Sequence, residues 1–90
     1  MNNFKVIIVE DVPLELKGTE GIFRNEIPEA EIIGTAENEQ SYWKLIKQQL
    51  PNLVLLDLGL GGSTTVGVEI CRQTKENYPE VKVLILLVKS

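Results

Sequence analysis

Three acidic residues that follow apolar runs are the part of this sequence most suited to chemistry. Glu10 and Asp11 come directly after the run VIIV at residues 6–9, and Asp57 follows the run LVLL at residues 53–56. In an open parallel α/β sheet, ligands bind beyond the carboxyl ends of the strands. If these two runs are neighbouring strands, the three carboxylates converge, and a divalent cation would offset their mutual repulsion.

The donor set narrows the kind of site that these acids could form. Oxygen ligands with room for water suit Mg²⁺ or Mn²⁺. Any single acid at a strand end can equally be an ordinary solvated loop residue, so the prediction depends on the three together. A nucleotide-binding half-domain is a weaker alternative, because residues 10–13 lack the glycines that let a backbone approach phosphate, and no Gly-Lys-Ser/Thr follows the glycines at 59–67.

The elements that must position these acids alternate between strand and helix. Their apolar runs are continuous rather than alternating, which predicts a parallel sheet covered by helices, in the order βαβαβαβ. The predicted strands cover residues 6–9, 31–36, 53–56 and 81–88. The predicted helices begin at Pro13, after the N-cap Asn38, and after a glycine-rich loop at 59–67. Their buried faces are predicted from Leu14, Leu16, Ile22, Phe23 and Ile27; from Tyr42, Leu45, Ile46, Gln49 and Leu50; and from Val68, Ile70, Cys71 and Thr74.

The composition excludes several classes of function. The chain has 90 residues, which we interpret as one domain over residues 1–90, and a net charge of −4. An acidic chain without a Lys/Arg cluster is a poor candidate for direct nucleic-acid binding. One cysteine and no histidine argue against a disulfide or a zinc site. With no apolar stretch of about 20 residues and no signal-peptide pattern, we expect no membrane association and a cytoplasmic location.

Four segments resemble the receiver domain of bacterial response regulators in order and spacing. They are KVIIVED at residues 5–11, LVLLDL at 53–58, GVE at 67–69 and the fourth strand after Pro79. The resemblance implies a flavodoxin-like three-layer α/β fold and a role in two-component signalling rather than an enzyme. It further implies that a histidine kinase phosphorylates Asp57, and that Glu10, Asp11, Asp57 and the backbone carbonyl of Gly59 hold Mg²⁺.

Two positions depart from the pattern of this family. Receivers commonly have proline at the position of Gly61, and the loop after Asp57 is about two residues longer than usual. A Thr or Ser near the end of the fourth strand usually donates a hydrogen bond to the phosphoryl group, and here that position holds Leu87. Ser90 lies three residues out of register. On this basis the usual hydroxyl switch is expected to be absent.

The chain also stops where family members continue. They add a last helix, strand and helix, with a Lys that pairs with the phosphate, so we expect an incomplete receiver fold. The fourth strand would then be an unpaired apolar edge, and we expect homo-oligomers to form through it. The sequence leaves two functions open. One is a phosphoacceptor receiver, and the other is a phosphorylation-inactive interaction module or a truncated fragment of a longer regulator.

Overall fold

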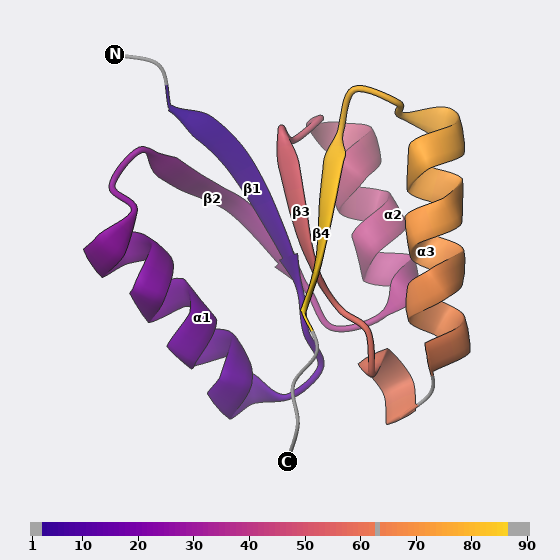
Figure 1. Ribbon diagram of the computed structural model, residues 1–90, viewed down its shortest axis with the longest axis horizontal. Coiled ribbons are helices and arrows are strands. Elements are labelled where there is room, and N and C mark those ends of the chain that lie inside the picture. The colour runs from indigo at the N-terminus through magenta and orange to yellow at the C-terminus, as the bar shows by residue number, and fades with distance from the viewer. Residues whose placement is uncertain (1–2, 63, 87–90) are drawn as a thin grey trace.

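The computed structural model describes residues 3–62 and 64–86, which form a four-stranded sheet with helices on both faces (Figure 1). Strands and helices alternate along the chain, so the predicted α/β class is confirmed. No helix in these ranges is long and apolar enough to cross a membrane. The elements are β1 (Phe4–Val9), α1 (Pro13–Glu26), β2 (Ala30–Ala36), α2 (Glu39–Gln48), β3 (Leu53–Asp57), the 3₁₀ turn η1 (Leu60–Gly62), α3 (Thr64–Asn77) and β4 (Lys82–Leu86).

All strand pairs are parallel, and the strands lie in the order β2-β1-β3-β4. The neighbours β1 and β3 place Val9 opposite Leu56. Their carboxyl ends therefore meet at one edge of the sheet, which is the arrangement that the acid cluster requires. Within the described residues β4 is the last strand on its side, and Leu84 there is 54% exposed.

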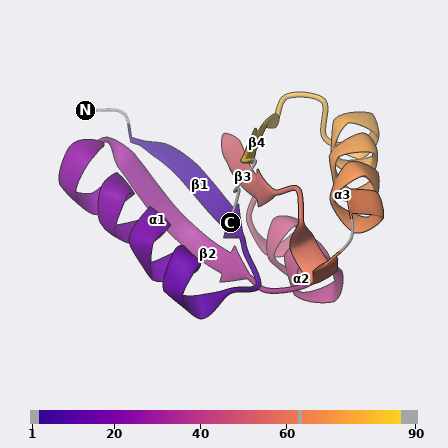
Figure 2. The ribbon, with the colours of Figure 1, turned by 60° about the horizontal axis from the view of Figure 1, so that its bottom comes forward.

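Two layers of helices cover the sheet. Figures 1 and 2 show α1 on one face and α2 and α3 on the other. Side chains of β1 point alternately to the two layers: Ile7 and Val9 pack with α2 and α3, whereas Val6 and Ile8 pack with Phe23 of α1. Because both faces of β1 are buried, its sequence is apolar at consecutive positions rather than at every second one.

Local signals fix where two helices begin. Pro13 is the first residue of α1, where its missing N–H costs no helical hydrogen bond. Asn38 caps α2: its Oδ1 accepts the Ser41 N–H at 2.8 Å, and the Ser41 Oγ accepts the Asn38 N–H at 3.3 Å. This reciprocal pair is a capping box, and it confirms the predicted start of α2.

The glycine-rich loop after Asp57 is shorter than predicted. α3 begins at Thr64, so Gly67 lies inside the helix and not at the end of a loop. Gly67 is buried, and a Cβ at this residue would lie 2.8 Å from the carbonyl oxygen of Leu58. Glycine is required here by a close backbone approach, and the prediction of a loop over residues 59–67 was wrong for that reason.

The predicted helix faces were wrong at four apolar positions. Leu14 and Ile22 of α1 are 81% and 59% exposed, and Val68 of α3 is 54% exposed. Leu50, which lies beyond the end of α2 at Gln48, is 44% exposed. At about 100° per residue, Leu14 and Ile22 each lie about 100° or more around the helix from Leu16 and Phe23, which face the sheet. One buried stripe cannot include all of them.

Candidate functional site

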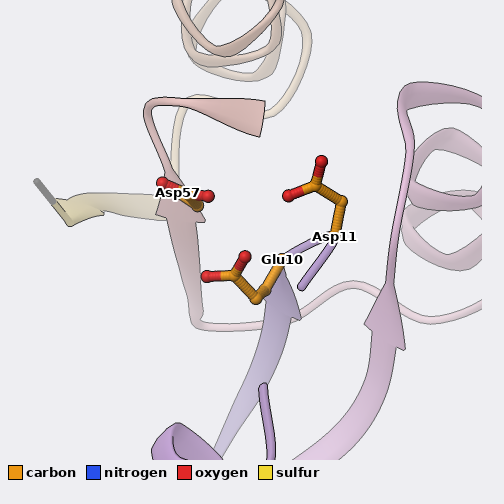
Figure 3. A group of neighbouring side chains, drawn as sticks. All are labelled: Glu10, Asp11 and Asp57. Atoms are coloured by element: carbon orange, nitrogen blue, oxygen red, sulfur yellow. The ribbon is translucent and has the colours of Figure 1, made fainter. Parts of the chain in front are cut away.

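The three predicted acids come together at the carboxyl edge of the sheet. Glu10 directly follows β1, Asp57 ends β3, and Asp11 is the next residue after Glu10. One carboxylate oxygen from each of the three lies within 4.8 Å of the others. Figure 3 shows the three side chains around a common space. The convergence inferred from the predicted strand pairing is therefore confirmed, and the donor set is made of oxygen atoms only.

Glu10 carries a buried carboxyl group with a raised pKa. Its residue is only 4% exposed, and its Oε2 accepts the Val12 N–H at 3.0 Å. Burial raises the pKa of Glu10 from 4.5 to about 7; the Val12 hydrogen bond acts in the opposite direction, and the negative charge of Asp57 adds to the increase. The carboxyl of Glu10 therefore gains and loses its proton closer to neutral pH than an ordinary glutamate does.

The turn after β3 donates backbone hydrogen bonds to the other two acids. The Gly59 N–H donates to Oδ1 of Asp57 at 3.0 Å, and the Gly61 N–H donates to Oδ2 of Asp11 at 3.1 Å. Asp57 is half-buried and Asp11 is exposed. The turn therefore holds Oδ1 of Asp57 and Oδ2 of Asp11. Neither Gly59 nor Gly61 donates to the other oxygen of these two carboxylates.

The remaining predicted positions have different outcomes. The Gly59 carbonyl accepts the Gly62 N–H at 2.9 Å, and its role as a metal ligand stays a prediction. Leu87 and Ser90 lie outside the described residues, so the expectation of a missing hydroxyl switch is untested. The Gly61 N–H was not predicted as a partner of Asp11, because a backbone donor leaves no side-chain signature in the sequence.

A family comparison matches nearly the whole chain. The model of the response regulator receiver domain matches residues 6–90. Over 85 residues the chain is 31% identical to the transcriptional regulatory protein DegU of Brevibacillus brevis. The matched segment covers 94% of this chain and 35% of DegU. It is 29% identical to the uncharacterized transcriptional regulatory protein YesN of Bacillus subtilis, over 92% of this chain and 22% of YesN. The chain thus spans about a third or less of the length of these relatives.

Solved structures of low identity support the fold alone. The RcsB response regulator of Salmonella typhimurium superposes with a TM-score of 0.85 at 22% identity, covering 99% of this chain and 44% of RcsB. The isolated receiver domain of RcsB from Salmonella enterica serovar Typhimurium, in the presence of the phosphomimetic BeF₃⁻, superposes with a TM-score of 0.86 at 21% identity. The latter match covers 99% of this chain and 64% of the RcsB chain.

Proposed function

Because this chain belongs to the response regulator receiver domain family, we propose that Asp57 accepts a phosphoryl group from a histidine kinase. In the same proposal Glu10, Asp11, Asp57 and the Gly59 carbonyl hold a Mg²⁺ ion. Phosphorylation on an aspartate is general for this family of signalling domains. The observation that carries the assignment to Asp57 is the convergence of three carboxylates at the ends of β1 and β3.

The residues of the cluster fit a magnesium ion by their chemistry. Mg²⁺ prefers oxygen ligands and keeps several of its waters, which suits a partly exposed site with three carboxylates. Burial, with the negative charge of Asp57 adding to it, raises the pKa of Glu10 to about 7, and a cation bound in the cluster would stabilise the ionised form of this carboxyl. When bound, the cation supplies electrostatic stabilisation of the transferring phosphoryl group. The Gly59 carbonyl oxygen already accepts the Gly62 N–H with one lone pair, so its other lone pair would coordinate the cation.

The geometry of Asp57 suits a nucleophile. Its Oδ1 is held by the Gly59 N–H, so Oδ2 is the oxygen that we assign to attack phosphorus. An Oδ2–P bond forms as the P–N bond of the donor phosphohistidine breaks, and the imidazole nitrogen leaves with the bonding electron pair and takes up a proton. Positioning and charge compensation account for most of the rate in such a transfer.

A small phosphodonor tests the assignment without the unknown kinase. We expect the wild-type chain with Mg²⁺ and acetyl phosphate to gain one phosphoryl group by intact mass spectrometry. Asp57→Asn, which is nearly isosteric, should gain none. Glu29→Gln, which changes an exposed carboxylate just before β2 at the amino-terminal edge of the sheet, should behave as wild type. Equal gain by wild type and Asp57→Asn, or no gain by wild type, contradicts the proposal.

The kinase, the output and the assembly of the protein belong to the same proposal. Because DegU and YesN are named transcriptional regulatory proteins, we propose that this chain is the receiver part of such a regulator, in the cytoplasm, with nucleic acid bound elsewhere than by this acidic chain. The phosphorylation-inactive module that the sequence left open is not favoured, since the acids converge as a phosphoacceptor site requires.

Self-association of the 90-residue chain is a separate part of the proposal. Two apolar side chains of β4, Leu84 and Ile85, are 54% and 39% exposed. Such a surface on β4, which is the last strand on its side within residues 3–62 and 64–86, favours pairing with a second copy. Sedimentation velocity should therefore show dimers or larger species at micromolar concentration, and Leu84→Lys should reduce them. A compact monomer throughout that concentration range contradicts this part.

A further inference from the structure

The turn η1 reaches across to the first loop of the chain at one point. The Gly61 N–H donates to Oδ2 of Asp11, a residue 50 positions earlier in the sequence. Gly61 has a φ of 69°, in the left-handed region where glycine is favoured, and its N–H donates to Asp11 from the peptide plane that it shares with the buried Leu60. The donor is a peptide group and the acceptor a carboxylate, so the hydrogen bond is charge-assisted when Asp11 is ionised.

Contacts on the other side of the turn fix the position of this donor. Leu60 is 1% exposed and belongs to the core beneath α2 and α3. The Gly62 N–H closes the turn on the Gly59 carbonyl at 2.9 Å. The backbone N–H of Gly61 is therefore attached to the packed core through the residue before it, whereas Asp11 itself is exposed. The rigid partner in this hydrogen bond is the turn, and the side chain it restrains is that of Asp11.

Without this restraint, electrostatics would drive Asp11 away from the cluster. One oxygen of its carboxylate lies within 4.8 Å of a carboxylate oxygen of Glu10 and of one of Asp57, and like charges at such a distance repel. An exposed side chain relieves that repulsion by rotating into solvent. The hydrogen bond from Gly61 opposes this rotation before any cation arrives.

We propose that Gly61 is a positioning residue, whose backbone N–H holds Asp11 in the cluster and so preorganises the proposed Mg²⁺ site. The inference depends on the proposed function, because it concerns a ligand of the same site. Loss of a group that orients a metal ligand weakens metal affinity by about 10–100-fold, and we expect a loss in that range here.

Two glycines of the turn provide a matched pair of variants. Gly61 and Gly62 both have positive φ, and a Cβ at either meets nothing within 4 Å, so alanine strains both without a clash. Only the Gly61 N–H donates to Asp11; that of Gly62 donates to Gly59. By calorimetric titration with MgCl₂, Gly61→Ala should bind at least tenfold more weakly than Gly62→Ala. Equal losses overturn the inference.

An amide-to-ester exchange at Gly61, in a chemically synthesised chain, removes the N–H alone and keeps the glycine conformation. It should weaken Mg²⁺ binding in wild type and have little further effect in Asp11→Asn; an unchanged affinity in wild type overturns the inference. The amide proton resonance of Gly61 without metal gives a separate readout, and should move upfield in Asp11→Ala. If it does not move, the positioning bond is absent, even where Mg²⁺ binds and Asp57 is phosphorylated. If it moves but wild type binds no Mg²⁺, the proposed site fails and the positioning role with it.

Discussion

The raised pKa of Glu10 makes magnesium affinity depend on pH near neutrality. A proton and a cation compete for this carboxylate, and the pKa in the metal-free fold is about 7. Glu10 is then ionised in about one-eleventh of molecules at pH 6 and about ten-elevenths at pH 8. The apparent Kd for Mg²⁺ should therefore fall about tenfold from pH 6 to pH 8 and change little above that.

Calorimetric titration with MgCl₂ at constant ionic strength measures this change directly. Glu10→Gln cannot titrate at this position, so its weaker binding should lose most of the dependence on pH. The matched control is Glu26→Gln, which removes an exposed carboxylate at the far end of α1 and should leave the tenfold change intact. A wild-type Kd that stays within about twofold between pH 6 and pH 8 would refute the argument from burial, because a carboxyl with an ordinary pKa is fully ionised across that range.

Three further predictions concern stability, measured by urea denaturation. Without metal, the free energy of unfolding should fall as pH rises from 4.5 to about 7, because the folded pKa of Glu10 lies above its unfolded value; Glu10→Gln should remove this slope. Gly67→Ala should lower the free energy of unfolding by about 1–3 kcal/mol, since the added Cβ would meet the Leu58 carbonyl. Gly18→Ala, where a Cβ meets nothing within 4 Å, should raise the free energy of unfolding by about 0.5–1 kcal/mol. The reverse order of the two variants would refute the role of close packing at Gly67. Tyr42→Phe should lower the free energy of unfolding by about 1–2 kcal/mol, because the buried Tyr42 hydroxyl is hydrogen-bonded to Thr74 Oγ1 at 2.7 Å. An equal loss in wild type and in a Thr74→Val background would show that this hydrogen bond contributes nothing.

Most of the fold follows from local sequence patterns. Where the structure differs from the prediction, the difference has a physical reason. Continuous apolar runs predict buried parallel strands, and two such strands ending in acids predict the cluster once they are neighbours. The exposure of Leu14 does not follow, since an apolar residue can lie on the outer side of a helix whose sheet-facing stripe is already complete. Gly67 is misread as a loop residue because glycine serves both for flexibility and for close packing.

The finer properties of the site depend on the assembled structure. The pKa of Glu10 is raised mainly by burial, and the burial of a side chain cannot be obtained from the composition of the sequence. The bond from Gly61 to Asp11 requires a turn, anchored by Leu60, that brings the peptide N–H of residue 61 to the first loop of the chain. Sequence predicts which groups meet at the edge of the sheet, and the tertiary structure determines how they are held and charged.

The central claim is that Asp57, and not its neighbours, carries the phosphoryl group. Borohydride converts an acyl phosphate to an alcohol, so treatment of the phosphorylated chain should leave homoserine in place of the modified aspartate. Peptide sequencing by mass spectrometry should find that homoserine at residue 57 and unmodified side chains at Glu10 and Asp11. Reduction at residue 10 or 11, or at none of the three, would contradict the account.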